Sequence, residues 1–281
     1  MWIAAQLGEG RIKVWVHAAH ELSEFNAPSD RGLGIEDQLL VLVGDLLPAD
    51  TVTLVVCAGA FGAARVVVPA APQAARQMMS HDSRLAVFAM PQLIQANPSD
   101  AMQGEEATIA GFIAAHPEWD GVLCITGSST RWVHISAGEV VSFRSFLTGE
   151  MFGLLTAQSS MRDAVAGQGW QADVFDSAVA DVMSRPERLS AALASIRANA
   201  LLLGVDPARA RAQLSGCLIG AELAATRVYW LGQNVALIGD GAIVESYGAA
   251  LRAQGAMMQI HSGDEMTLRG LQDAHEKLRG S

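Results

Sequence analysis

The chain has 281 residues, of which 51% are hydrophobic and 17% are charged. This composition can bury a large core, which excludes a disordered segment and predicts one large domain or two modest ones. The formal net charge is −10 and no basic run is present, which argues against nucleic acid or an anionic membrane as a partner.

No apolar run approaches the roughly 20 residues that cross a bilayer, and the first residues lack the pattern of a signal peptide. Cys57, Cys124 and Cys217 each lie alone in an apolar stretch, unlike the cysteines of a disulfide framework or a metal site. They are typical of small buried hydrophobic residues in a reducing compartment. We therefore expect a soluble cytoplasmic protein.

The beginning of the chain predicts a mixed α/β arrangement. Two short apolar segments, 2–5 and 12–16, flank a turn at Gly8-Glu9-Gly10 and predict a β-hairpin. Residues 21–34 are polar and predict a loop. Residues 35–57 then predict a helix, from apolar side chains at helical spacing, followed by a buried strand rich in β-branched residues.

A second series of strands begins at residue 121. Strands are predicted at 121–125, 131–135 and 139–146, with the small-residue turn Gly127-Ser128-Ser129-Thr130 between the first two. This order resembles that of the first hairpin, so we expect the two halves to share one pattern without sequence identity. The helix predicted at 107–116 lies between them in the chain, and we interpret it as a bridge between two lobes.

The rest of the chain is mostly helical. A strand predicted at 235–238 runs into Gly239-Asp240-Gly241, and a helix begins at Ala242; this order typically presents backbone N–H groups to an anion or a nucleoside. Asp206-Pro207 is typical of a helix N-cap and the first helical residue. The other helices are predicted at 151–157, 163–183 with a break at Gly167 and Gly169, 190–203, 208–229, and 266–279 with Asp264 as N-cap.

Three turns of small residues are candidates for binding a phosphate chain. They are Gly8-Glu9-Gly10, Gly127-Ser128-Ser129-Thr130 and Gly239-Asp240-Gly241. Backbone donors approach a phosphate best where no Cβ obstructs them, and hydroxyl groups help, so the second turn is the best candidate. Each turn alone is typical of an ordinary connection. Their order along two similar halves favours the functional interpretation.

An acidic cluster, Asp100, Glu105 and Glu106, lies near the start of the helix at 107–116. It could simply pair with the positive end of the helix dipole. Alternatively, one carboxylate could act as a general base that activates a substrate hydroxyl for attack on phosphorus. Gly216 and Gly220, four residues apart in a predicted helix, indicate close packing of that helix against a strand.

Other catalytic patterns are missing from the sequence. The seven histidines show no metal-ligand spacing. Neither a Gly-x-Ser-x-Gly elbow nor a Gly-x-x-x-x-Gly-Lys loop is present, which argues against a serine hydrolase and a P-loop protein.

Four segments, taken in order, resemble the 2-dehydro-3-deoxygalactonokinase family, sugar-acid kinases of the actin, hexokinase and Hsp70 superfamily. Weaker matches at Arg197, at Leu237-Ile238-Gly239 with Tyr247, and from Ala253 onward extend the resemblance over nearly the whole chain. The four segments are Met102-Gln103-Gly104-Glu105-Glu106, residues 126–133, Phe146-Leu147-Thr148-Gly149-Glu150-Met151-Phe152, and residues 214–223.

The resemblance implies an α/β, two-lobed actin-like ATPase (ribonuclease H-like) fold with a nucleotide cleft between the lobes. Residues 1–117, with the bridging helix, would bind a sugar acid, and residues 118–281 would bind ATP. The implied reaction is ATP-dependent phosphorylation of the terminal hydroxyl of 2-dehydro-3-deoxygalactonate, with Mg²⁺, in galactonate breakdown. The sequence does not determine the oligomeric state, and a homo-oligomer is one of the possibilities.

The resemblance also assigns roles to single residues. Glu105 is our choice of catalytic base, with Asp100 as the alternative. Gly59 and Arg197 are assigned to the sugar acid, whose carboxylate could also meet Arg131 or Arg144. The nucleotide and its phosphates are assigned to Gly8, Glu9, Gly127, Ser128, Ser129, Thr130, Arg131, Gly239 and Asp240.

The chain departs from the family pattern at the first turn. Gln6, a neutral amide, stands where the family has the Asp that orients hydrated Mg²⁺, and Glu9 stands where it has Thr. Glu9 could hold the metal instead or repel the nucleotide, and Gln6 could act only through water. Losing one group that stabilises charge at a transferring phosphoryl typically costs about 10²-fold or more in rate.

Two further departures are Gln103 in the bridge motif and Ser129 in the second turn. Residues 58–69 also lack the aromatic and acidic residues of the family. Three functions therefore stay open: an active kinase of the family type, a kinase for a different small acid, and a catalytically weak or inactive relative that binds a sugar acid or nucleotide as a sensor or regulatory protein.

Overall fold

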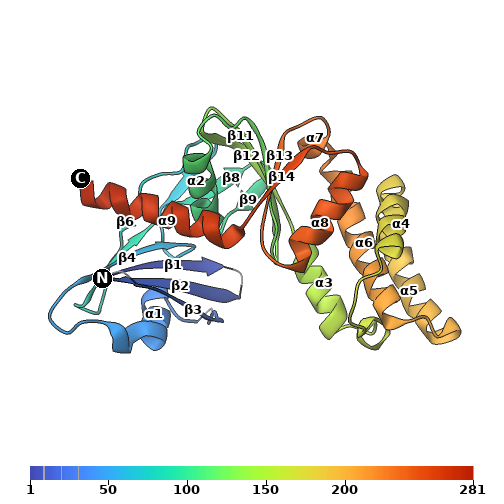
Figure 1. The fold of residues 1–281 in the computed structure, drawn as a ribbon, viewed down its shortest axis with the longest axis horizontal. Helices are drawn as coiled ribbons and strands as arrows, with labels where there is room; N and C mark the ends of the chain where they lie inside the picture. The colour runs from blue at the N-terminus through green and yellow to red at the C-terminus, as the bar shows by residue number, and fades with distance from the viewer. Residues whose placement is uncertain (9, 20, 31, 281) are drawn as a thin grey trace. The chain divides into compact units, whose positions relative to one another are not determined.

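The computed structural model describes residues 1–8, 10–19, 21–30 and 32–280 (Figure 1). The chain divides into two compact units. Unit 1 comprises Met1–Asp120, Ile135–Phe143 and Ser262–Ser281, and unit 2 comprises Gly121–His134 and Arg144–His261. This division departs from the predicted 1–117 and 118–281, because two later segments of the chain group with the N-terminal part.

Unit 1 is built on a six-stranded sheet with the order β3-β2-β1-β4-β7-β6. β1 pairs with β2, and β2 with β3, in antiparallel fashion, whereas β1 with β4 and β4 with β7 are parallel. A three-stranded sheet has the order β5-β8-β9. The strands are β1 (Trp2–Gly8), β2 (Arg11–Ala18), β3 (Glu21–Pro28), β4 (Thr53–Ala58), β5 (Arg65–Val67), β6 (Arg76–Gln77), β7 (Leu85–Ala89), β8 (Gln92–Ala96) and β9 (Ser99–Ala101).

The loop predicted over residues 21–34 is wrong for its first part, which forms the edge strand β3. Phe25 and Ala27 are partly buried against the core of the unit, while the alternate side chains, such as Glu24 and Asn26, face solvent. An edge strand needs only one weakly apolar face, because its partner strand supplies the hydrogen bonds. The polar composition therefore concealed it.

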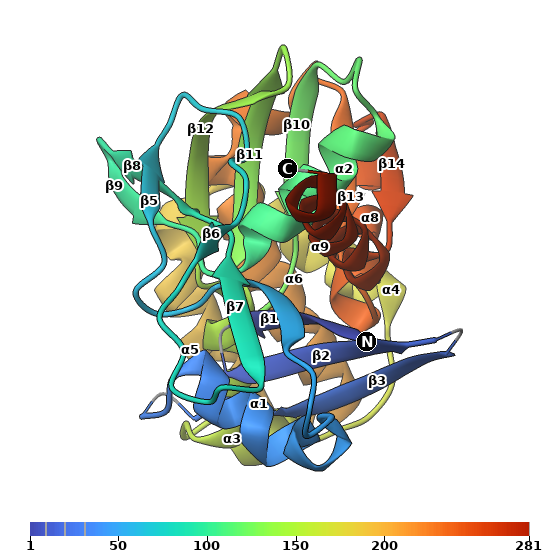
Figure 2. The same cartoon turned by 90° about the vertical axis from the view of Figure 1, so that its left-hand side faces the viewer.

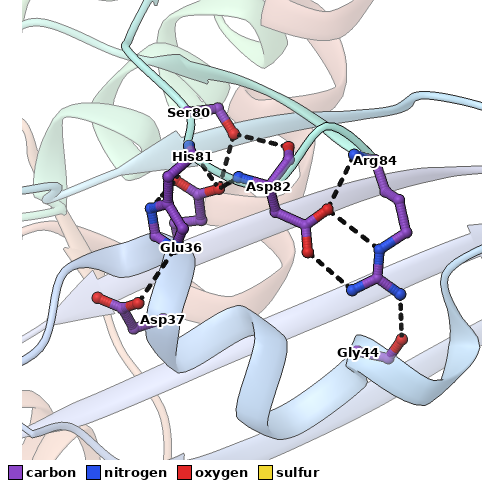
Figure 3. Close-up of polar contacts among 7 residues, drawn as sticks. All are labelled: Glu36, Asp37, Gly44, Ser80, His81, Asp82 and Arg84. Carbon is purple, nitrogen blue, oxygen red and sulfur yellow. Dashed lines mark hydrogen bonds and ion pairs between the residues drawn. The ribbon is translucent and has the colours of Figure 1, made fainter.

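Helix α1 (Ile35–Val43) packs on the core of this sheet through Ile35, Leu39 and Val43. Its first turn also anchors a loop, as Figure 3 shows. The buried Glu36 carboxylate accepts hydrogen bonds from Ser80 Oγ at 2.7 Å and from the amide nitrogen of Asp82 at 2.7 Å. A short 3₁₀ helix, Gly44–Leu46, follows α1.

Helices α2 (Glu105–Ala115) and α9 (Gly263–Gly280) lie side by side in unit 1 (Figures 1 and 2). They approach so closely that a Cβ at Gly111 would overlap the carbonyl oxygen of Met266, and one at Gly270 would overlap that of Ala107. This packing explains why the C-terminal helix groups with the N-terminal part of the chain. The helix predicted as a bridge is therefore a member of unit 1.

Unit 2 contributes to a five-stranded sheet with the order β12-β11-β10-β13-β14. In this sheet β10 pairs with β13, and β13 with β14, in parallel fashion. Each large sheet thus has three consecutive strands followed by two parallel ones, and the sheet of unit 1 adds the antiparallel strand β6. The pattern predicted to repeat in the two halves is confirmed. The strands are β10 (Gly121–Ile125), β11 (Thr130–Ser136), β12 (Glu139–Phe146), β13 (Val235–Ile238) and β14 (Met258–His261).

The helices of unit 2 include a close pair, α4 and α6. A Cβ at Gly216 would lie 2.5 Å from Phe175 O, and one at Gly220 would lie 2.7 Å from Val179 O. These glycines therefore permit helix-to-helix packing rather than the predicted packing against a strand. The helices are α3 (Thr148–Ala157), α4 (Ala172–Ser184), α5 (Leu189–Leu203), α6 (Pro207–Ala225), α7 (Arg227–Trp230) and α8 (Ala242–Ala253), with 3₁₀ turns at Arg162–Val165 and Pro186–Arg188.

Smaller sequence predictions are also confirmed. Asp206 caps α6 by accepting from the amide nitrogen of Ala208, and Pro207 is its first residue. All three cysteines are buried and free; burial raises the pKa of the Cys57 thiol to about 12, which makes it unreactive. None of the helices in the described part of the chain combines the length and apolarity that a membrane span requires.

Candidate functional site

Unit 2 contains a cavity of about 780 Å³, a size typical of small-molecule sites. Its wall is formed by the turn between β10 and β11, the start of α3, the segment before α4, one face of α6 and the start of α8. The lining residues are Gly127, Ser128, Thr148, Gly149, Phe152, Gln168, Gly169, Trp170, Arg211, Ala212, Ser215, Leu218, Ile219, Ala242, Ile243, Glu245, Ser246, Tyr247 and Ala249.

Gly127 and Ser128, from the predicted phosphate turn, form one end of this wall. The first turn of α3 presses against them: the amide of Glu150 donates to Ser128 O at 2.7 Å, and a Cβ at Gly149 would overlap Gly127 O. The backbone of this turn is therefore held by a helix N-terminus, and a helix N-terminus favours anions.

Three other residues predicted to contact phosphates do not line the cavity. The side chains of Ser129, Thr130 and Arg131 are only 5%, 0% and 3% exposed. Thr130 Oγ1 is 2.9 Å from the hydroxyl of Tyr247, so its side chain is used inside the protein. Within the turn, the cavity thus reaches the backbone and the small side chains of its first two residues.

The predicted adenosine loop lies beside the phosphate turn. The amide of Thr126 donates to Ile238 O at 2.8 Å, and a Cβ at Gly239 would overlap Thr126 Oγ1. Asp240 is exposed and does not line the cavity. The cavity wall begins instead with Ala242, at the start of α8, so the helix after the loop, and not the loop itself, contributes to the wall.

A residue to which the sequence assigned no role, Glu222 of α6, lies beneath this wall. Its side chain is buried, and its carboxylate accepts hydrogen bonds from Trp132 Nε1 at 2.7 Å, from the Tyr247 hydroxyl at 2.6 Å and from Thr148 Oγ1. Burial raises the pKa of Glu222, and the hydrogen bonds oppose this rise. The sequence marks it as a single Glu in the mostly apolar segment 214–223, one of the four that resemble the family.

In unit 1, Glu106 joins two of the predicted site segments. Its carboxylate oxygens accept from the amide of Gly59 at 2.8 Å and from that of Gly104 at 2.9 Å. Gly59 has φ +77°, and a Cβ there would overlap Leu7 O. The side chain is buried, and burial together with the charge of Glu105 raises the pKa of Glu106 to about 7.

The predicted base, Glu105, is half-buried at the first position of α2, and its Oε2 accepts from the amide of Gln103 at 2.7 Å. Gln6 lies close by, since its Nε2 donates to Gly104 O at 3.1 Å. Asp100 lies in β9, where its carboxylate accepts from the amide of Ala101 at 2.9 Å. The structure therefore places Gln6 next to the segment that carries Glu105. Asp100 lies in the three-stranded sheet, whereas Gln6 lies in the six-stranded sheet.

The remaining predicted residues are less informative. Gly8 ends β1, and Glu9 lies outside the described residues. Arg197 is exposed on α5 and does not line the cavity. Gly59, the other residue assigned to the sugar acid, belongs to unit 1, whereas Arg197 belongs to unit 2. Arg144 is exposed on β12.

Within the described ranges of the chain, no three His, Cys, Asp or Glu side chains lie close enough together to hold a metal ion. Gln6, the predicted water-mediated metal contact, is neutral and uses its amide nitrogen on Gly104. The described residues therefore do not fit a metal held by the protein alone.

A model of the family described as 2-keto-3-deoxy-galactonokinase matches residues 8–274. The protein described as "Probable 2-dehydro-3-deoxygalactonokinase DgoK1" from Rhizobium meliloti (strain 1021) is 35% identical over 183 residues, which are 62% of this chain. The matched part spans 58% of the length of that relative.

Two solved structures are also similar. The crystal structure of a candidate 2-dehydro-3-deoxygalactonokinase from Sinorhizobium meliloti covers 99% of this chain and 97% of its own, with a TM-score of 0.85 and 27% identity. The activator of 2-hydroxyisocaproyl-CoA dehydratase from Clostridium difficile, with bound ADPNP, covers 100% and 97%, with a TM-score of 0.51 and 13% identity. With the repeated strand order, these likenesses confirm the predicted actin-like α/β fold.

Proposed function

Because the chain belongs to the 2-keto-3-deoxy-galactonokinase family, we propose that it transfers the γ-phosphoryl group of ATP to the terminal hydroxyl of 2-dehydro-3-deoxygalactonate. The observation that supports this most directly is the cavity of unit 2, which combines a glycine turn, a helix N-terminus and an apolar helix face. Those are the parts that a nucleoside triphosphate requires. A small-molecule substrate and a cytoplasmic location belong to the same proposal.

In this proposal the backbone of Gly127 and Ser128, with the N-terminus of α3, receives the phosphates. The start of α8 and the facing side of α6 enclose the adenosine, and Trp170 and Phe152 supply aromatic surface. Positioning and charge stabilisation provide most of the catalysis in phosphoryl transfer. A turn held rigidly by neighbouring backbone is suited to that task.

We assign the proton transfer to Glu105. Its carboxylate would take the proton of the acceptor hydroxyl as that oxygen attacks the γ-phosphorus, and ADP would leave. Glu106 would hold the neighbouring backbone by accepting from Gly59 and Gly104. The sugar acid would then lie at the carboxyl ends of β1 and β4, beside Gly59.

Magnesium bound to ATP would neutralise charge on the phosphate oxygens. Such ions usually need only one or two carboxylates, in addition to phosphate oxygens and water. The described residues offer no metal cluster, so we assign no step to a residue that binds the ion.

The test is a coupled assay of ADP release with ATP, Mg²⁺ and 2-dehydro-3-deoxygalactonate. We expect turnover that requires all three components. A panel of other aldonic and 2-keto-3-deoxy acids would reveal a different acceptor. Turnover equal to the rate without enzyme, for every acid, would contradict the proposal.

A second candidate is a catalytically weak or inactive relative that binds the nucleotide or sugar acid as a sensor. Gln6 supports it, because an amide tied to Gly104 cannot supply the negative charge that the family's Asp provides. Ligands that raise the melting temperature without any turnover would favour this candidate. A Gln6→Asp variant that gains turnover would identify the missing charge as the cause.

A further inference from the structure

We propose that ionised Glu222 is a positioning residue for the nucleotide, because it holds the hydroxyl groups of Thr148 and Tyr247 behind the cavity wall. Both partners line the cavity, whereas Glu222 itself does not. This inference rests on the proposed function, since it concerns the ATP cavity.

The carboxylate collects donors from three elements other than its own. Trp132 belongs to β11, Thr148 to α3 and Tyr247 to α8, while Glu222 lies on α6. These elements are far apart in the sequence, yet they provide most of the cavity wall or its support. One side chain thus links the parts of the site.

The hydrogen bonds that Glu222 accepts from Trp132 and Tyr247 have defined directions. The indole nitrogen of Trp132 can only donate, so it requires an acceptor on Glu222. Tyr247 has a single hydroxyl proton, which it donates to Glu222. Thr130 Oγ1 lies 2.9 Å from the Tyr247 oxygen, and a hydrogen bond from Thr130 also opposes the rise in the pKa of Glu222. An ionised carboxylate therefore orders the whole group as acceptor.

Both ends of the phosphate turn depend on this group. At one end, Thr148 precedes Gly149, which is packed against Gly127 O. At the other end, Thr130 is held through Tyr247. Displacing the two hydroxyl groups would therefore move the backbone that receives the phosphates.

A buried carboxylate costs free energy unless it is fully hydrogen-bonded, and an apolar residue would often stabilise the fold as well or better. Glu222 is 3% exposed, and its donors Trp132, Thr148 and Tyr247 are all neutral. We therefore infer that Glu222 serves the geometry of the cavity rather than the stability of the fold.

The test compares Glu222→Gln with Glu36→Gln. The first variant keeps the shape but places an NH₂ group where Thr148 or Tyr247 donates. The second makes the same change at another buried carboxylate with several donors, in unit 1, which does not line the cavity (Figure 3). We expect Glu222→Gln to raise the Kd for ATP roughly tenfold, and Glu36→Gln to leave it unchanged.

Equilibrium titration with ATP separates positioning from loss of folded protein, because partial unfolding lowers the number of sites without changing their Kd. The KM for the sugar acid should also stay within about twofold of wild type. If Glu222→Gln binds ATP with the wild-type Kd, the inference is overturned. If wild-type protein binds no ATP at all, the proposed function fails first.

Should Glu222→Gln not fold, Tyr247→Phe provides the same test. It removes one donor to Glu222 and keeps the ring in the cavity wall. We expect the Kd for ATP to rise about threefold with a normal number of sites, and an unchanged Kd would overturn the inference.

Discussion

The rings of Trp2 and His275 stack with their centroids 4.0 Å apart and their planes within 7°. His17 stacks on Trp2 at 4.1 Å and 8°. Burial lowers the pKa of both histidines. Positive charge on His275 further lowers the pKa of His17, and the positive charges of Arg279 and the N-terminus further lower the pKa of His275. Both imidazoles are therefore held in the neutral form, which links the stability of unit 1 to pH.

We predict that His275→Gln is less stable than wild type at pH 7.5 and that this gap narrows at pH 5.5. A histidine whose pKa is lowered on folding binds its proton more readily in the unfolded chain, so its contribution to stability is lost as pH falls below about 6.5. Chemical denaturation at both pH values measures the gap. A gap that widens at pH 5.5 would mean that the protonated ring stabilises the stack.

We predict that Glu105→Gln lowers kcat by roughly 10² to 10⁴ with little change in the affinity for ATP. The expected cause is loss of the proton acceptor for the sugar-acid hydroxyl. Steady-state kinetics with each substrate varied in turn measures both effects. The matched control is Asp100→Asn, at a carboxylate in β9. A large loss in Asp100→Asn, with Glu105→Gln near wild type, would transfer the assignment to Asp100.

We predict that Gly111→Ala lowers the free energy of unfolding by about 3 kcal/mol. Its methyl group would overlap the carbonyl oxygen of Met266, so α2 and α9 would have to separate. Gly153→Ala is the control: it lies in α3, exposed, and a Cβ there meets nothing within 4 Å. This substitution should stabilise by about 0.5–1 kcal/mol, because Ala is the better helix former. Equal effects of the two substitutions would exclude close packing of α2 on α9.

We predict that Glu36→Gln lowers the free energy of unfolding at pH 7 by about 1–3 kcal/mol. Burial acts to raise the pKa of Glu36, but hydrogen bonds from Ser80, Asp82 and His81 outweigh it and lower the pKa. A carboxyl whose pKa falls on folding stabilises above its unfolded pKa near 4.5, and this stabilisation is lost as pH falls further. The difference between variant and wild type should therefore shrink between pH 5 and pH 3. A difference independent of pH would exclude the charge as its origin.

Features that depend on neighbouring residues were predictable. The strand–turn–strand at Gly127-Ser128-Ser129-Thr130, the Asp206-Pro207 helix start and the strand before Gly239 all appear as expected. Each arises from backbone preferences within a few residues, which composition and periodicity report directly. Three of the four family motifs, residues 126–133, 146–152 and 214–223, likewise contribute residues to the cavity wall.

Contacts between distant segments were not predictable. Glu222 becomes a hydrogen-bond acceptor for Trp132, 90 residues away, and β3 becomes a strand because β2 supplies its partners. Thr130 turns inward because Tyr247 lies behind it. The free energy of such contacts depends on which segments pack together, and a local pattern of apolar and polar residues carries no information about that choice. The local segments of the cavity wall were therefore predictable from the sequence, whereas the tertiary packing sets which side chains support that wall from behind.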